Sequence, residues 1–162
     1  MDPAIIVRPA TIDDALGIAT VHVRAWQETY SHLVSPERLA TLVPSDRFAG
    51  WQGMLAAGGE RAWVAESGGE VVGWITASER DPAGHPRDRE VNGIYALARV
   101  HGSGTGQRLL DAAIGDDPAF LWCAADNPRA SAFYRKNGFE LDGTTSEHPL
   151  LGSPVTIARW VR

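Results

Sequence analysis

The strongest constraint on the fold is a change in the spacing of apolar residues near residue 61. Upstream of it, residues 12–30 place apolar side chains three and four positions apart, which is typical of an amphipathic helix: Ile12, Leu16, Ala19, Val23, Trp26 and Tyr30. Downstream, RAWVAE (61–66) and EVVGWITASE (70–79) have the character of strands, and Ser67-Gly68-Gly69 between them is a hairpin signal. A chain with both patterns must pack helices against a sheet, so an α/β fold is expected.

The remaining segments continue this alternation. Thr11 and Asp14 form a capping-box pattern at the start of the first helix. A second helical region is expected to begin at Ser35-Pro36, to be interrupted by Pro44 and to resume through Phe48, Trp51 and Leu55. Further strands are expected at 4–8, 90–97, 119–124, 138–143 and 153–161, and further helices at 105–114 and 127–137. The expected fold class is α/β, a single domain over residues 1–162 with a mixed β-sheet flanked by helices in the order β-α-α-β-β-β-α-β-α-β-β.

Composition limits the classes of function. The net charge of −5 disfavours a nucleic-acid partner and mildly favours neutral or cationic ones. We expect no membrane span, since no apolar run is long enough, and a cytoplasmic location, since the first residues lack a basic segment followed by an apolar one. One cysteine and five histidines without metal spacing predict no metal site and no internal disulfide, and Cys123 is expected in the core rather than as a nucleophile.

A run of three glycines, HGSGTGQ (101–107), lies between a predicted strand and a predicted helix. Unpaired N–H groups and a positive dipole end stand at the first turn of a helix, and glycines let a ligand approach them, so a phosphate is the expected occupant. A surface turn that merely tolerates glycine is the alternative. The run lacks the lysine and hydroxyl of a Walker loop, and Gln107 stands where a dinucleotide-binding fingerprint needs its last glycine.

Two motifs resemble those of the GCN5-related N-acetyltransferase (GNAT) family. His101–Gly106 is similar to the acetyl-CoA loop pattern R/Q-x-x-G-x-G/A, with His101 in place of Arg or Gln. The pattern N-x-x-A-x-x-F-Y-x-x-x-G-F is met by Asn127, Ala130, Phe133, Tyr134, Gly138 and Phe139. The segments 6–19 and 63–75 also look like members of this family, so the resemblance covers nearly the whole chain and implies a GNAT-like sheet.

The resemblance implies direct transfer of an acetyl group from acetyl-CoA to a primary amine. In it, Tyr134 would protonate the leaving thiolate, Glu90 would accept a proton from the amine, and a free N–H near Ala96 or Leu97 would polarise the thioester carbonyl. Strand alternation predicts Glu90, Asn92, Ile94 and Ala96 on one face, toward a gap between the fourth and fifth strands. The implied cofactor-binding set is Ala96, Leu97, His101, Gly102, Ser103, Gly104, Thr105, Gly106, Gln107, Asn127 and Tyr134.

The acceptor side is less specified. The resemblance implies a pocket walled by the first two helices and by the last hairpin near 143–153, with Trp26, Glu28 and Tyr30 as substrate-binding candidates. Core packing is the alternative for Trp26, and a solvated strand start for Glu90. A polyamine, an amino acid, an antibiotic or a protein amino terminus all remain possible as the small-molecule or peptide amine. A homodimer is common in the family, and the alternative to an enzyme is a non-catalytic acyl-CoA-binding sensor or partner module on the same fold.

Overall fold

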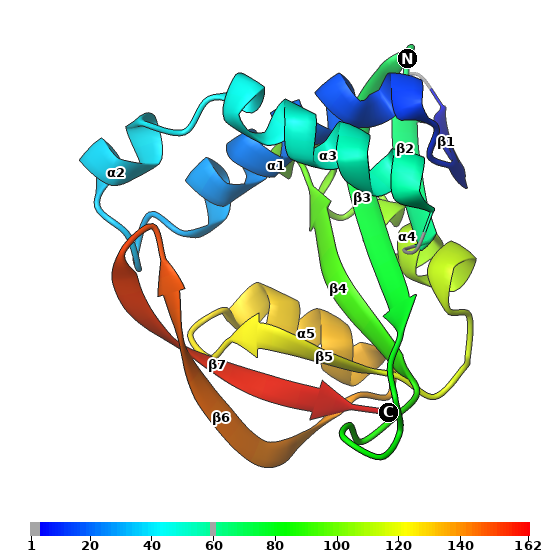
Figure 1. The fold of residues 1–162 in the computed structure, drawn as a ribbon, viewed down its shortest axis with the longest axis vertical. Helices are drawn as coiled ribbons and strands as arrows, with labels where there is room; N and C mark the ends of the chain where they lie inside the picture. Colours follow the sequence, from blue (N-terminus) through cyan, green and yellow to red (C-terminus); the bar gives the residue numbers. More distant parts are fainter. Residues whose placement is uncertain (1–3, 59–60) are drawn as a thin grey trace.

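A seven-stranded sheet in the order β1-β2-β3-β4-β5-β7-β6 forms the centre of the molecule (Figure 1). The computed structural model describes residues 4–58 and 61–162. Its strands are β1 Ile5–Pro9, β2 Arg61–Ser67, β3 Glu70–Glu79, β4 Arg89–Ala96, β5 Phe120–Ala124, β6 Glu140–Leu150 and β7 Ser153–Val161. Its α-helices are α1 Ala15–Thr29, α2 Pro36–Ala40, α3 Pro44–Ala57, α4 Thr105–Ala113 and α5 Pro128–Lys136, with short 3-10 turns at Ile12–Asp14 and Ala98–Val100. The predicted α/β class and element order are confirmed, with the second helical region divided into two helices.

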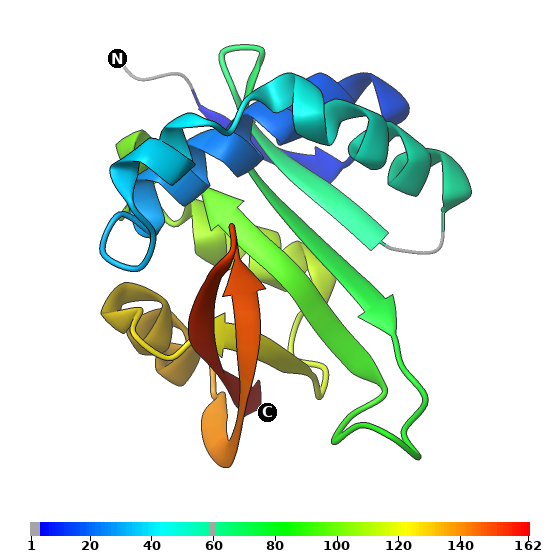
Figure 2. The same cartoon turned by 60° about the vertical axis from the view of Figure 1, so that its left-hand side comes forward.

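The two faces of the sheet are covered by different helices, as Figures 1 and 2 show. Helices α1 and α3 pack on one face, in a core that includes Ile18, Trp51 and Trp74. Helices α4 and α5 pack on the other, where Leu109 and Tyr134 belong to the largest apolar cluster. Helix α1 lies close to the sheet because it presents small residues there. A Cβ added at Gly17 would lie 2.7 Å from the Val71 side chain.

The first helix begins as its capping box predicts, but its buried face differs from the predicted stripe. Asp14 accepts from the Thr11 N–H at 2.7 Å and forms an ion pair with Arg8 at 2.8 Å. Residues 12–14 form a 3-10 turn, so Ile12 lies outside the α-helix and out of phase with it. Ile12 is 52% exposed, Leu16 in the first turn of α1 is 55% exposed, and the buried residues of α1 are Ala15, Ile18, Ala19, Val21, Val23 and Ala25.

Prolines set the helix boundaries in the second helical region. Pro36 and Pro44 each stand in the first turn of a helix, where the missing N–H has no intrahelical partner to lose. The interruption predicted at Pro44 is therefore confirmed. Among the described residues, 4–58 and 61–162, no helix is both long and apolar enough to cross a membrane.

The centre of the sheet opens between β4 and β5. These strands are parallel, and they pair only through Glu90 with Phe120 and Val91 with Leu121. Beyond Val91 they diverge, as Figure 1 shows, while β5 stays paired with β7 along its whole length. The edge of β4 that faces this opening is therefore free to present backbone groups to a ligand.

A β-bulge in β4 corrects the predicted alternation. Val91 pairs with Ala77 and Gly93 with Thr76, so Asn92 is an extra residue, and its Oδ1 accepts from the Ser78 hydroxyl at 2.9 Å. A bulge inverts the facing of every later residue of its strand. Glu90 therefore shares the α1 face with Tyr95, and Ile94 and Ala96 lie on the α4 face with Val91. The prediction that Glu90, Ile94 and Ala96 share one face is wrong.

The last hairpin is longer than the sequence predicts. Strand β6 was expected to end at residue 143 and continues to Leu150, because it pairs again with β7 after an irregularity between Leu141 and Thr145. The turn that follows contains Leu151 and Gly152, both at positive φ. This extension brings the hairpin tip beside α1 and α2, where Arg38 donates to the Leu151 carbonyl oxygen at 3.2 Å.

Candidate functional site

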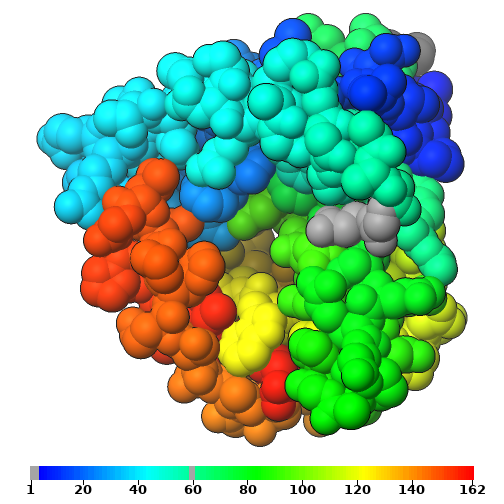
Figure 3. Space-filling model, in the orientation of Figure 1, coloured from blue at the N-terminus to red at the C-terminus, as the bar shows by residue number. Residues whose placement is uncertain are grey.

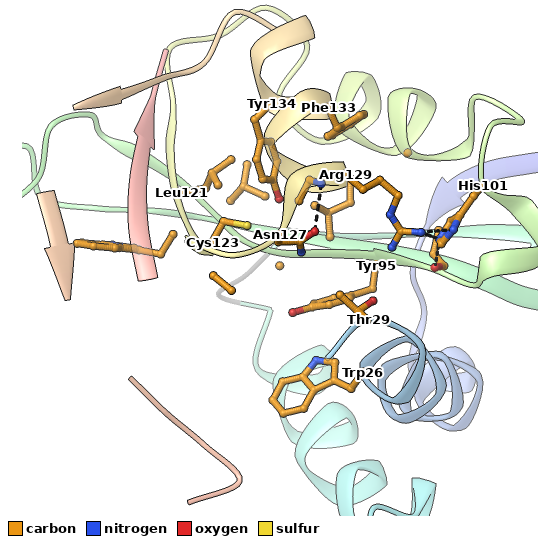
Figure 4. Close-up of a pocket in the computed structure, with 18 of the residues that line it drawn as sticks. Trp26, Thr29, Tyr95, His101, Leu121, Cys123, Asn127, Arg129, Phe133 and Tyr134 are labelled. Atoms are coloured by element: carbon orange, nitrogen blue, oxygen red, sulfur yellow. Dashed lines mark hydrogen bonds between the residues drawn. The ribbon is translucent and has the colours of Figure 1, made fainter. Parts of the chain in front are cut away.

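A cavity of about 760 Å³ lies at the opening between β4 and β5. Figure 3 shows the surface hollowed there, and Figure 4 shows residues that line it. The glycine-loop side is formed by residues 100–102 and 104–107, together with Asn127 and residues of α5. The aromatic side is formed by Trp26, Thr29, Tyr30 and Tyr95, with His148, Leu150, Val155 and Ile157 from the last hairpin. The cavity thus joins the two faces of the sheet.

The glycine loop has a conformation that needs glycine at two positions. Gly102 and Gly104 have φ values of 77° and 84°, in the left-handed region, and Gly104 is the N-cap residue of α4. The Ser103 hydroxyl donates to the Val100 carbonyl oxygen at 2.6 Å and pairs with the Thr105 hydroxyl at 2.7 Å. Ser103 therefore shapes the loop. Ser103 and Thr105 were both predicted as cofactor contacts, but only Thr105 of the two lines the cavity.

Gly106 differs from Gly102 and Gly104, because its backbone conformation does not require glycine. It lies in the first turn of α4 without a positive φ, and an added Cβ would meet only the Phe133 ring, at 3.5 Å. That distance is ordinary van der Waals contact, so the fold itself would accept alanine here. Gly106 lines the cavity. Since the fold does not require glycine at this position, the reason for glycine is access of a ligand to the backbone.

His101 and Arg129 form a pair at the mouth of the loop (Figure 4). His101 lies in the cavity as predicted, and its Nε2 is 2.9 Å from the Ala96 carbonyl oxygen, which makes Nε2 the protonated nitrogen. Nδ1 then accepts from the Arg129 guanidinium. Arg129 was not predicted as a site residue, because it occupies a variable position of the Asn127 motif. Lys136, two residues after Tyr134, also lines the cavity, and no sequence motif predicted it.

Hydrogen bonds show which backbone amide near the end of β4 is free, and what the side-chain amides of Asn127 and Gln107 contact. The Leu97 N–H donates to the Val72 carbonyl oxygen at 2.9 Å, so the expected free amide cannot be that of Leu97. In an antiparallel ladder successive amides point to opposite sides, and the N–H of Ala96 therefore faces away from β3, toward the opening. Asn127 lines the cavity and caps α5, its Oδ1 accepting from the Ala130 N–H at 3.2 Å. Gln107 also lines the cavity, with its amide bonded to Asn137 at 2.7 Å.

Tyr134 and Cys123 face each other across the narrow part of the cavity. The Tyr134 ring descends from α5 with its hydroxyl directed toward the cavity, as Figure 4 shows, and its side chain is only 7% exposed. Burial raises the pKa of Tyr134 well above its usual value, so the phenol is a neutral proton donor. Burial also raises the pKa of Cys123 to about 11, so its thiol is neutral. Cys123 was expected in the core, and the structure places it half-buried in the cavity wall.

The aromatic side contains two of the three predicted acceptor residues. Trp26 and Tyr30 line the cavity, and the Tyr30 hydroxyl lies 2.7 Å from that of Tyr95. Glu28 does not line it, because its carboxylate accepts from the Ala98 N–H at 2.8 Å on the far side of α1. Tyr95 also lines the cavity and was not predicted as a site residue. The hairpin wall predicted at 143–153 is present through His148 and Leu150.

Glu90 lies at the closed end of the opening. Its carboxylate forms an ion pair with Arg80 at 2.6 Å. Glu90 is not among the described residues that line the cavity. A proton could reach it from the cavity only through water. The predicted role of Glu90 as a base stays a prediction. Within the ranges 4–58 and 61–162, no group of three or more His, Cys, Asp or Glu side chains is arranged to hold a metal ion.

Comparison with known proteins identifies the family. The family model described as "Acetyltransferase (GNAT) family" matches residues 20–139. The probable N-acetyltransferase Rv2775 of Mycobacterium tuberculosis is 32% identical over 156 residues, covering 92% of this chain and 88% of that protein. The PaiA N-acetyltransferase of Thermoplasma acidophilum, solved in complex with coenzyme A, has a TM-score of 0.70 at 17% identity, with 96% of this chain and 98% of that chain covered.

A second solved structure gives the same fold. The ribosomal-protein-alanine N-acetyltransferase of Brucella melitensis has a TM-score of 0.71 at 23% identity, with 97% of this chain and 98% of that chain covered. The family match begins within α1 and includes the glycine loop and the Asn127 motif, and the fold match covers 97% of the chain. The chain therefore belongs to the GNAT family of acetyltransferases, and it is an acyltransferase enzyme.

Proposed function

We propose that the chain transfers an acetyl group from acetyl-CoA directly to a primary amine, with both substrates meeting in the cavity between β4 and β5. The observation that carries this proposal is the position of Tyr134, a buried neutral phenol, between a glycine loop and an aromatic pocket. A sensor that only bound an acyl-CoA would need no proton donor there. The coenzyme A bound in the Thermoplasma neighbour supports the cofactor assignment by analogy.

The residues present fit a coenzyme A thioester. The loop amides from Gly102 to Gln107 would hold the diphosphate, at the positive end of the α4 dipole. Arg129 and Lys136 add positive charge on the same side of the cavity. The open space above Gly106, where a Cβ would meet only the Phe133 ring, leaves room for a ligand near the backbone. Acetyl-CoA, when bound, supplies the activated acetyl group as a thioester.

Three groups of this chain would then act on the reacting atoms. The Ala96 N–H would donate to the thioester carbonyl oxygen as that oxygen gains negative charge. As the amine nitrogen bonds to the carbonyl carbon and the carbon–sulfur bond breaks, the Tyr134 hydroxyl would give its proton to the sulfur. The excess proton of the amine would leave through water, with Glu90 as the carboxylate at the end of that path. Tyr134 would regain a proton from solvent.

Binding and turnover measured together test this proposal. Calorimetry should detect coenzyme A binding to the wild-type protein, and a thiol reagent should detect free coenzyme A released from acetyl-CoA only when a primary amine is added. Binding without amine-dependent thiol release over a broad amine panel would instead support the sensor alternative. Mass spectrometry of the acetylated amine separates acetyl transfer from simple thioester hydrolysis.

A further inference from the structure

The aromatic side of the cavity contains no described carboxylate. Its walls are the rings of Trp26, Tyr30 and Tyr95, the Thr29 side chain, and His148 with three aliphatic residues of the last hairpin. The two tyrosine hydroxyls are bonded to each other at 2.7 Å, and burial raises the pKa of both, so they remain neutral. Of all the described residues that line the cavity, on either side, none is Asp or Glu. A positive charge on a ligand would find no counterion there.

The carboxylates closest in sequence to these walls are held by other partners or by solvent. Glu28 accepts from the Ala98 N–H at 2.8 Å, and Glu90 is paired with Arg80 at 2.6 Å. Glu147 accepts from the Thr156 hydroxyl at 2.6 Å on the hairpin. Asp126 precedes Asn127 with a side chain that is 70% exposed, near His32. None of these four residues lines the cavity, so a ligand would have to extend out of the cavity to reach one of them.

The charges that do face this region are positive. Arg129 and Lys136 line the glycine-loop side. The Arg47 guanidinium lies over the Trp26 ring, 5.4 Å from its centroid. Burial and the charge of Arg47 lower the pKa of His22, next to Trp26, to about 4. Arg47 thus occupies one face of the Trp26 ring, and its charge repels a second cation near that ring.

We infer that the acceptor is a primary amine with an apolar or aromatic body and no second positive charge, and that polyamines and other polycations are poor acceptors. This inference rests on the proposed function. The reacting amine can lose its proton before it attacks, whereas a second ammonium group would have to enter the aromatic side charged and unpaired. The aromatic walls match a ring or an alkyl chain, since these gain from apolar contact and from ring stacking.

Matched pairs of amines test the charge preference directly. Benzylamine and 1,4-bis(aminomethyl)benzene share one ring and differ by one aminomethyl group, and propylamine and 1,3-diaminopropane form an aliphatic pair. The monoamine of each pair should have the higher kcat/KM by about tenfold or more, because the diamine carries an uncompensated charge into an apolar site. The same amines should keep this order in calorimetric binding to the protein saturated with coenzyme A, a measurement that needs no turnover.

A carboxylate introduced into the wall should change the preference. Thr29 lines the aromatic side at the end of α1, and Thr29→Glu would supply a counterion, with Thr29→Gln as the uncharged control. The kcat/KM ratio of monoamine to diamine should fall by about tenfold in Thr29→Glu and stay near the wild-type value in Thr29→Gln. Asn92→Asp adds a charge with almost no change of shape, because the Ser78 hydroxyl still has its acceptor, and it should act in the same direction.

The outcomes separate the two proposals. Two results would overturn the inference and leave acetyl transfer intact. One is a wild-type preference for the diamines. The other is a monoamine-to-diamine kcat/KM ratio that is equal in Thr29→Glu and Thr29→Gln and unchanged in Asn92→Asp. Stronger binding of the monoamines without any thiol release would support the inference and remove the proposed function. Thermal unfolding of each variant shows whether the fold is kept, and the wild-type amine pairs remain a complete test if a variant fails to fold.

Discussion

The two sides of the cavity are built from different parts of the chain. On the glycine-loop side, the contacts proposed for a ligand are backbone amides of one continuous segment, residues 101–107, at the start of α4. The aromatic side uses side chains from α1, β4 and the last hairpin, which are far apart in sequence. Backbone recognition needs glycines at fixed spacing and is therefore visible in a sequence, whereas a wall of side chains exists only after the elements have packed. The following experiments act on one side at a time.

The largest effect is expected at Tyr134, where the two sides meet. Tyr134→Phe removes only the hydroxyl and should lower kcat by about 10²–10⁴-fold, the usual contribution of a positioned general acid. The Kd for coenzyme A should change little, because the ring remains in place against Phe133 and Phe139. Steady-state kinetics and calorimetry on the same preparation measure both quantities. Full activity in the Phe variant would mean that water protonates the thiolate.

Gly106 should separate ligand binding from folding on the glycine-loop side. Gly106→Val should raise the Kd for coenzyme A by about 100-fold, or about 2.7 kcal/mol, because a side chain would occupy the path of the diphosphate. Gly106→Ala should weaken binding less and should not lower the free energy of unfolding, since alanine has the higher helix propensity. Gly53→Ala is the matched control, a helical glycine of α3 with no atom within 4 Å of an added Cβ. Unchanged Kd values in both Gly106 variants would contradict the loop assignment.

The contrast between the two sides also explains which predictions failed. The order of the elements follows from apolar spacing, and the glycine loop follows from Gly102, Gly104 and Gly106. The exposed position of Ile12 arises from a 3-10 turn, and the reversed facing of Ile94 and Ala96 arises from a bulge. Such single-residue irregularities shift a periodic pattern without any signal in composition.

Site residues on the aromatic side were predicted less well for a related reason. Trp26 and Tyr30 share a helix face that the resemblance assigns to the acceptor side, and both line the cavity. His148 reaches the cavity because β6 extends to Leu150, and Tyr95 lies on the α1 face of β4 because of the bulge. Glu28 was expected to bind substrate, and its carboxylate instead accepts from the amide of Ala98. Local spacing could not reveal contacts that join α1 to residues seventy positions away.

A smaller effect, on stability, is expected from the hydroxyl pair of the aromatic side. Tyr30→Phe leaves the buried Tyr95 hydroxyl without its partner and should lower the free energy of unfolding by about 1 kcal/mol, measured by urea denaturation. The double variant Tyr30→Phe with Tyr95→Phe should recover part of that loss, because no buried hydroxyl is then unpaired. A double variant that loses twice as much as the single one would contradict this account.

The same pair predicts a loss of stability at alkaline pH. Burial raises the pKa of Tyr30 and of Tyr95, so the folded state holds these protons more tightly than the unfolded chain does. The resulting stability is present below about pH 10, where unfolded tyrosines begin to ionise, and is lost as the pH rises through the higher folded-state values. The wild type should therefore lose more stability than the double Phe variant between neutral and strongly alkaline pH, and equal slopes would count against buried neutral tyrosines.

The smallest effect is expected at Glu90, which lies outside both sides of the cavity. Since Arg80 already holds its carboxylate at 2.6 Å, any proton must arrive through water, and Glu90→Gln should lower kcat/KM by less than about tenfold. If Glu90 assists, the loss should be greatest near neutral pH and should shrink toward alkaline pH, because an alkylamine with a pKa near ~10 then supplies its own neutral form. Arg80→Gln is the informative control, since it removes the same ion pair and leaves the carboxylate in place. A structural role predicts equal losses and parallel pH profiles for the two variants, whereas a proton-accepting role predicts a neutral-pH defect in Glu90→Gln alone.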